Sequence, residues 1–220
     1  MKKLLHFIIV LLLSICFYQV SAQEKQARNP IVFADIPDMS IMRIGDTYYM
    51  SSTTMHMCPG VPIMKSKDLV NWQTISYAYE TLGENDAMNL VDNKNAYGRG
   101  TWASCIRYHN NTFYVSSFSS TTGKTYIWST NDIEKGPWKE ISFSPSFHDH
   151  TLVFEDDGRA YLIYGNKRLT LVELNADLSG VKTGGINQVI IENSSLPSGI
   201  YVVRMAAETI GAHGSALYSN

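Results

Sequence analysis

The chain has 220 residues, of which 45% are hydrophobic, 11% aromatic and 17% charged, with a formal net charge of -2 at pH 7. This composition excludes a disordered, collagen-like or coiled-coil protein, and the near-balance of charge argues against a dedicated nucleic-acid binder. The 13 Tyr, 8 Phe and 4 Trp favour a fold rich in β-strand. The length suffices for one domain with its own core.

The first 22 residues have the pattern of an export signal. A basic start is followed by an apolar run over residues 4–17, and small residues close the segment as a cleavage site. A membrane anchor is the alternative, but the apolar run is short for a span. A lipid anchor on Cys16 is disfavoured because the residue before it is not small. We therefore expect a signal peptide over residues 1–22 and a secreted or periplasmic mature chain over 23–220, with no membrane span.

The mature chain keeps two cysteines, Cys58 and Cys105. A disulfide between them is one option, but two cysteines form no disulfide framework, and small buried thiols are favoured. No cluster of Cys and His has the spacing of a zinc site, so we expect neither a metal nor another cofactor.

Three Tyr-rich segments repeat one pattern along the chain. Each has an apolar strand, a turn rich in Gly, Asn or Asp, and an aromatic strand with alternating polarity, and the copies cover residues 43–52, 107–117 and 154–165. This pattern predicts a β-hairpin in each copy. Within the third copy, the acidic run 155–158 resembles a calcium loop but is better explained as the hairpin turn.

Each hairpin is followed by a second pair of predicted strands. Residues 62–72 and 126–138 share a strand, a turn containing Asp68 or Asp132, and a closing Trp, whereas residues 171–178 form a weaker third copy. The repeated aspartates are expected to be structural. Four strands per unit, at a period of about 50 residues, predict an all-β fold built of β-propeller blades. A β-sandwich is the alternative.

The repeat also marks a recurring position ahead of each hairpin. Counting back five residues from Arg43, Arg107 and Phe154 gives Asp38, Trp102 and Asp149. In a propeller the first strand of each blade lines the central axis, so these three side chains are expected to converge on one cavity. Two carboxylates can carry out proton chemistry while an indole packs on the C–H face of a sugar. The pattern therefore predicts a sugar site.

Each of these residues has a simpler structural explanation. Asp38 is common in Pro-Asp turns, and Trp102 would serve equally in core packing. Asp149 lies between His148 and His150, which suggests a metal site. However, alternation along a strand would place both histidines on the face opposite Asp149, so a hydrogen-bonded polar pair is favoured over metal ligands.

Four ordered motifs resemble those of family 43 glycoside hydrolases, in particular its β-xylosidases and α-L-arabinofuranosidases. The matching segments are residues 29–50, 59–72, 100–109 and 147–158. The resemblance covers roughly residues 29–190. It implies a five-bladed β-propeller that hydrolyses pentose-containing plant polysaccharide or oligosaccharide with inversion. Three blades are expected over 29–95, 96–145 and 146–190, and the start of a fourth over 191–220.

The resemblance also implies roles for individual residues. Asp38 matches the general base of the family, and Asp149 matches the aspartate that tunes the pKa of the acid and orients the substrate. In an inverting enzyme the acid and base carboxyls stand about 6.5–9.5 Å apart to admit a water. The family's general acid is a Glu in the fourth blade. The corresponding stretch here, residues 211–218, holds His213, and Glu208 lies nearby in the sequence. Neither residue is in the sequence context of the family's acid.

The length of the chain bears on its expected activity. A five-bladed ring at this period needs on the order of 250–300 residues. We therefore expect a truncated chain with about three and a half blades that is inactive by itself. A carbohydrate-binding propeller without catalysis is the alternative function.

Overall fold

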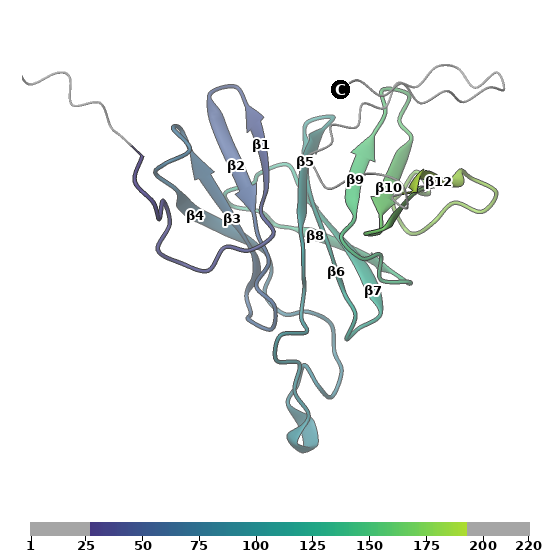
Figure 1. The fold of residues 1–220 in the computed structure, drawn as a ribbon, viewed down its shortest axis with the longest axis horizontal. Coiled ribbons are helices and arrows are strands. Elements are labelled where there is room, and N and C mark those ends of the chain that lie inside the picture. Colours follow the sequence, from purple (N-terminus) through teal and green to yellow (C-terminus); the bar gives the residue numbers. More distant parts are fainter. Residues whose placement is uncertain (1–26, 193–220) are drawn as a thin grey trace, which may run out of the picture.

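The computed structural model describes residues 27–192, which form three four-stranded sheets (Figure 1). In each sheet the strands are antiparallel and lie in chain order. In chain order a short 3₁₀ turn, η1 (Val91–Asn93), comes after the first sheet and before the second. The described range contains no α-helix. No helix within it has the length and apolarity to cross a membrane. The all-β prediction is confirmed for this part of the chain.

Twelve strands make up the sheets. The first sheet contains β1 (Ser40–Ile44), β2 (Thr47–Ser51), β3 (Gly60–Ser66) and β4 (Gln73–Tyr79). The second contains β5 (Cys105–His109), β6 (Thr112–Ser119), β7 (Lys124–Thr130) and β8 (Lys139–Phe143). The third contains β9 (Thr151–Phe154), β10 (Ala160–Tyr164), β11 (Arg168–Glu173) and β12 (Asn187–Glu192).

The predicted hairpins are the first two strands of each sheet. They pair as β1–β2, β5–β6 and β9–β10, with the aromatic strand second. The acidic run ahead of β10 is a hairpin turn, as predicted, because the amide of Glu155 donates to the carbonyl of Arg159 at 2.9 Å. The backbone hydrogen bonds of the turn therefore explain the conformation of the acidic run.

The second strand pairs are also present, and their aspartates are structural, as expected. Asp68 accepts hydrogen bonds from the amides of Val70 and Asn71, and Asp132 accepts from those of Glu134 and Lys135. The third copy differs, since residues 174–186 form a longer excursion before β12. β12 then continues to Glu192, past the expected blade boundary at residue 190.

The first strands of the three sheets lie side by side. β1 contacts β5, and β5 contacts β9, so the sheets fan out from these inner strands (Figure 1). The guanidinium of Arg107 on β5 donates to the carbonyl of Leu152 on β9 at 3.0 Å, which joins the second and third sheets directly. Three four-stranded sheets arranged in this way fit part of a β-propeller.

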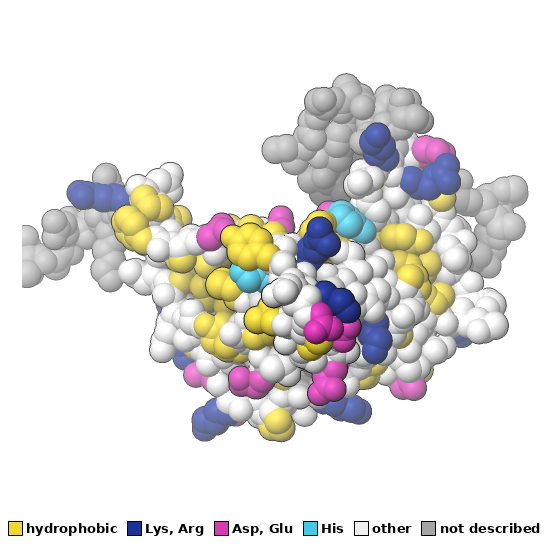
Figure 2. Space-filling view, turned by 90° about the horizontal axis from the view of Figure 1, so that it is seen from below, with side chains coloured by type: hydrophobic (Ala, Val, Ile, Leu, Met, Phe, Trp, Pro, Cys, Tyr) yellow, Lys and Arg dark blue, Asp and Glu magenta, His cyan; other side chains and the backbone are white. Residues whose placement is uncertain are grey.

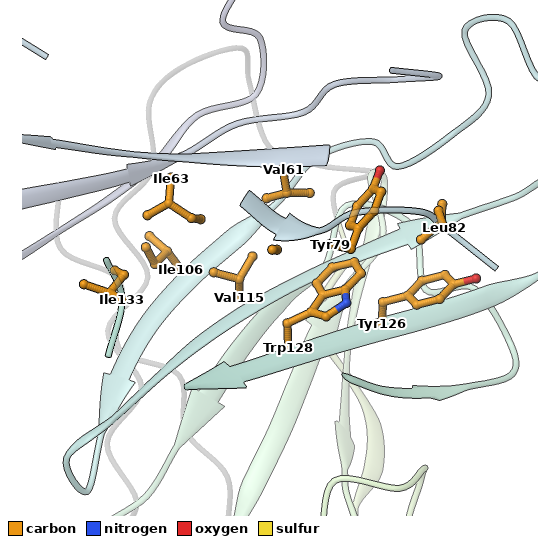
Figure 3. Close-up of a cluster of buried hydrophobic side chains, with 10 residues drawn as sticks. Val61, Ile63, Tyr79, Leu82, Ile106, Val115, Tyr126, Trp128 and Ile133 are labelled. Carbon is orange, nitrogen blue, oxygen red and sulfur yellow. The ribbon is translucent and has the colours of Figure 1, made fainter. Parts of the chain in front are cut away.

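Two hydrophobic layers fill the space between neighbouring sheets. The first and second sheets share a layer drawn in Figure 3, and its buried members include Val61, Ile63, Tyr79, Ile106, Val115, Tyr126 and Trp128. The second and third sheets share another, with Cys105, Ile127, Phe143, Phe147, Leu152, Leu162 and Val172. In the first layer the ring of Trp128 stacks with that of Tyr79, at 5.1 Å, and with that of Tyr126, at 5.4 Å.

The middle sheet serves both layers because its strands alternate their side chains. On β7, Tyr126 and Trp128 face the first sheet, whereas Ile127 between them faces the third. Successive residues of a strand point to opposite faces, so a fully buried strand reads as a continuous apolar run. Burying these aromatic and aliphatic side chains is the main stabilising contribution to this part of the molecule.

The cysteines follow the sequence prediction only in part. Cys105 is buried, as predicted, and its thiol lies 3.3 Å from the hydroxyl of Thr151. Cys58 is exposed, and both thiols are free. The expectation of a buried thiol is therefore wrong for Cys58, because its Cys-Pro peptide lies in the loop between β2 and β3 and not in a strand.

Candidate active site

The hairpin register defines equivalent positions in the three sheets. The repeated tyrosines pair across each hairpin as Tyr49 with Met42, Tyr114 with Arg107, and Tyr161 with Val153. The residues four positions before these partners are Asp38, Ala103 and Asp149. We call these three the pre-strand residues, because each one lies just ahead of the first strand of its sheet.

Trp102 therefore lies one position away from where the sequence count placed it. Trp102 is equivalent in register to Pro37 and His148, and Ala103 is the residue equivalent to the two aspartates. Backbone hydrogen bonds support this register independently, pairing Thr53 with Pro37, Trp102 with Phe118, and Gly165 with His148. The sequence count was wrong by one residue because it matched Arg107 to Arg43, whereas strand pairing matches Arg107 to Met42.

The two aspartates share an unusual backbone conformation. Asp38 has φ 50° and Asp149 has φ 48°, which is the left-handed region. Asp and Asn tolerate this region better than most residues because their short polar side chains bond locally. Ala103 is not among the residues with positive φ. The same tight turn thus presents a carboxylate ahead of β1 and again ahead of β9.

Contacts with β5 bring the two turns toward one another. The amide of Ile106 donates to the hydroxyl of Ser40 at 3.2 Å, and on the other side the thiol of Cys105 meets the hydroxyl of Thr151. Ser40 and Thr151 each follow a pre-strand aspartate by two residues. The two aspartates therefore flank the start of β5. In Figure 1 the strands β1, β5 and β9 all begin toward the lower end of the sheets.

Both carboxylates are open to solvent at this end of the molecule. Asp38 is exposed, and 47% of the Asp149 side chain is accessible. Figure 2 looks onto this end and shows hydrophobic and histidine side chains exposed among acidic and basic ones. An exposed carboxylate can take a proton from water or contact a sugar hydroxyl.

Trp102 is half-buried and packs toward the third sheet. Its indole N–H donates to the carbonyl of Gly98 at 2.9 Å, and its ring meets Phe118 and His148 edge to face, each at 6.0 Å. The ring thus packs on the core residue Phe118 and also contacts His148, which precedes Asp149 in the chain. Its role as a sugar contact stays a prediction.

The histidines on either side of Asp149 do not both lie on the face opposite it, contrary to expectation, because His148 contacts its carboxylate. His148 is exposed, and its Nδ1 lies 3.1 Å from the carboxylate of Asp149. His150 is buried, and its Nδ1 pairs with the carbonyl of Phe147 at 2.9 Å. The expectation failed because Asp149 lies in a turn with positive φ, where strand alternation does not apply.

Burial also sets the protonation of His150. Removal from water lowers its pKa to about 4, so the ring is neutral near pH 7. Its Nε2 has no hydrogen-bond partner within residues 27–192. In the same range, no group of three or more His, Cys, Asp or Glu side chains is placed to hold a metal ion.

His148 is the residue of the site that the sequence analysis did not propose as a functional one. It contacts both Asp149 and Trp102, and its signal in the sequence was only its adjacency to Asp149. The two candidates for a general acid, Glu208 and His213, lie outside the described residues. A groove of about 370 Å³ between β4 and residues 134–138 contains none of the predicted site residues.

Comparisons with known proteins identify the family of the chain and agree with its fold. The model for "Glycosyl hydrolases family 43" matches residues 27–212. A β-xylosidase of Formosa agariphila is 41% identical over 140 residues, which is 61% of this chain and 23% of the relative. A non-reducing end α-L-arabinofuranosidase of Bacteroides ovatus is 30% identical over 158 residues, covering 71% of this chain and 29% of the relative.

A solved structure shows the same arrangement of strands. It is described as a bifunctional GH43-CE of Bacteroides eggerthii, and it superposes with a TM-score of 0.74 at 61% identity. The match covers 78% of this chain and 22% of that one. The chain thus spans about a quarter of the length of the curated relatives and solved structure described above. Because the family model matches most of its residues, the chain belongs to glycosyl hydrolases family 43.

Proposed function

We propose that this chain contributes the base side of an exported glycoside hydrolase that cleaves pentose-containing polysaccharide or oligosaccharide with inversion. One observation carries the proposal. Two exposed aspartates occupy the same pre-strand position, in the same left-handed turn, on the two sides of the start of β5. The names of the matched relatives, a β-xylosidase and an α-L-arabinofuranosidase, support a pentoside substrate.

In this proposal Asp38 is the general base. Its carboxylate removes a proton from a water that attacks the anomeric carbon from one face of the sugar ring. An acid on the opposite face donates a proton to the leaving oxygen, and the configuration at the anomeric carbon inverts. The proton balance closes because the base takes one proton from water and the acid gives one to the departing alcohol.

Asp149 acts on the acid and on the substrate in the same scheme. A nearby negative charge disfavours ionisation of a carboxylic acid, so an anionic Asp149 helps the acid to keep its proton until the bond breaks. His148 holds the Asp149 carboxylate at 3.1 Å, which fixes its orientation. Trp102, beside His148, supplies an aromatic surface for the sugar ring.

The remaining parts of the proposal concern the whole protein. The three sheets would be blades of a five-bladed ring that places the acid opposite Asp38. The basic and apolar segment over residues 1–22 would direct export. We propose that the chain hydrolyses pentosides poorly by itself, because neither Glu208 nor His213 has the sequence context of the family's acid.

Hydrolysis of aryl β-xyloside and aryl α-L-arabinofuranoside tests the function. Activated aryl groups leave with little protonation. Attack by a water that Asp38 deprotonates should therefore release the aryl alcohol slowly even where the acid is weak. Proton NMR of the first-formed sugar should show the anomer opposite to that of the substrate. Retention of configuration would contradict the mechanism. Binding of pentosides with no turnover would favour a carbohydrate-binding module instead.

A further inference from the structure

A second aromatic surface lies beside the proposed site, on the loops that precede β3 and β5. The ring of Tyr97 lies 4.2 Å from the ring of His56, with an angle of 34° between the planes. Tyr97 is nevertheless 76% exposed. One face of the tyrosine is therefore covered by the histidine, and the other is open. We call these two residues the His–Tyr platform.

The backbone around the platform is fixed before any ligand binds. The amide of Gly98 donates to Nδ1 of His56 at 3.1 Å, and Met55 pairs with Thr101 in an isolated bridge. A Cβ atom on Gly100 would lie 1.7 Å from the carbonyl oxygen of Met55, so only glycine permits this close approach. Such preorganisation lowers the entropy lost when a ligand binds.

The platform is joined directly to the residues of the proposed active site. The carbonyl of Gly98, next to Tyr97, accepts the indole N–H of Trp102. The ring of Trp102 in turn meets His148, which holds Asp149. Residues 80–104, which carry Tyr97, extend beyond the sheets at the end where the pre-strand residues lie (Figure 1). A ligand that contacts the indole of Trp102 is therefore close to the segment that carries Tyr97.

The chemistry of the platform suits a sugar ring. The open face of Tyr97 offers an apolar surface, and its hydroxyl can both donate and accept hydrogen bonds. Because Nδ1 of His56 accepts from Gly98, the proton of the neutral ring lies on Nε2, which is free to donate to a hydroxyl. A flat apolar face with polar groups at its edge matches the C–H face and hydroxyls of a pyranose or furanose.

We propose that the His–Tyr platform is a binding subsite for a second sugar unit of a pentose oligosaccharide whose neighbouring unit lies at Trp102 and the two aspartates. This inference rests on the proposed function. It predicts that the platform adds affinity for chains of two or more sugars and leaves the affinity for a single sugar unchanged.

Calorimetric titration of the purified chain with xylose and xylotriose, and with arabinose and arabinotriose, tests the subsite. Tyr97→Ala should weaken binding of the preferred trisaccharide about tenfold, the effect of losing about 1.4 kcal/mol of stacking, and should leave the monosaccharide unaffected. Tyr97→Phe keeps the ring and should retain most of the affinity. The control is Tyr108→Ala, since Tyr108 is 41% exposed in the second sheet near the opposite end of β5.

The outcomes separate this inference from the function on which it rests. If the unchanged chain binds neither monosaccharide nor trisaccharide, the proposed function fails, and the subsite fails with it. If the sugars bind but Tyr97→Ala leaves the trisaccharide affinity as it was, the subsite alone is wrong. Equal weakening of both sugars also overturns it, because the substitution would then have disturbed the site at Trp102.

Discussion

The turn before β1 and the turn before β9 reach the same geometry with different residues. Both hold an aspartate with φ near 50°. The first is held by the amide of Thr53, which donates to the carbonyl of Pro37 at 3.3 Å, and by the hydroxyl of Ser52, which donates to the same carbonyl at 2.7 Å. The hydroxyl of Thr53 also donates to the carbonyl of Thr101, in the loop before β5, at 2.6 Å. In the third sheet Gly165 occupies the position of Thr53, and its amide donates to His148.

The comparison shows that the backbone position is retained while its supports change. Gly165 has φ 113°, and a Cβ there would lie 2.0 Å from the carbonyl oxygen of Arg168. The residues just after the aspartates differ as well, since Met39 is 55% exposed and His150 only 4%. Both turns thus share a backbone hydrogen bond, to which the first adds the hydroxyl of Ser52, whereas the third has a glycine and a buried ring at the equivalent positions.

The largest expected effect comes from removing the proposed base in the first turn. In a form of the enzyme that hydrolyses pentosides, Asp38→Asn should lower kcat by roughly 10²–10⁴-fold while sugar binding survives, because water activation is lost and the pocket is kept. Steady-state kinetics and titration with a pentoside measure the two quantities. Turnover close to that of the unchanged enzyme would remove Asp38 from the mechanism.

A matched substitution separates chemistry from backbone strain at the same position. Asn adopts the left-handed conformation readily, so Asp38→Asn should not alter stability noticeably. Asp38→Ala should lower the free energy of unfolding by about 1 kcal/mol, because a left-handed conformation is unfavourable for alanine. Urea unfolding of the two variants measures the difference.

The buried histidine of the third turn should make stability depend on pH. Its pKa is about 4 in the folded chain and 6.5 when unfolded, so the unfolded state binds the extra proton between these values. The contribution is fully present above pH 6.5 and is lost as the pH falls toward 4, by about 3 kcal/mol in total. Urea unfolding at pH 7 and pH 4.5 measures this loss.

Substitutions at two equivalent positions, His150 and Met39, test whether His150 causes this pH dependence. His150→Leu should reduce the loss of stability on acidification, because no proton is then gained at this position. Met39→Leu, at the equivalent exposed position, should leave the pH dependence unchanged. If His150→Leu follows the same pH dependence as the unchanged chain, another group is responsible.

A smaller loss of stability is expected where the two turns are supported differently. Gly165→Ala should lower the free energy of unfolding by about 2 kcal/mol, because alanine cannot adopt φ 113° without strain and its Cβ meets a carbonyl. Thr53→Ala should lose about 1 kcal/mol, the net worth of its hydrogen bond to Thr101. Thermal unfolding ranks the pair, and an equal or reversed order would show that the turns are supported alike.

The smallest effect concerns the pH profile of turnover. Asp149→Asn should move the basic limb of the kcat/KM profile to lower pH, because the acid loses the negative charge that raised its pKa and ionises earlier. The rate on the acidic side should change less. Kinetics on an unactivated pentose disaccharide, whose leaving group needs the acid, give the profile from pH 4 to pH 9, and an unmoved basic limb would exclude this role for Asp149.

Sequence reasoning found the hairpins, the structural aspartates and the two pre-strand aspartates because each depends on local patterns. Turn residues and alternating aromatic strands identify a hairpin without any knowledge of its neighbours. The position of Trp102 was wrong by one residue, since strand pairing and not residue similarity sets the register. The expectation that His148 lies opposite Asp149 was also wrong, because a left-handed residue interrupts strand alternation.

The sequence by itself determined the all-β class and the repeat, because these follow from composition and from the two-residue period of strands. The repeat in turn marked Asp38 and Asp149 as equivalent positions. Only the tertiary structure decided which groups meet. It brought His148 to Asp149 and Trp102, buried His150, and joined Tyr97 to His56 across two loops. These contacts connect residues through left-handed turns and neighbouring loops, and no periodicity along the chain encodes them.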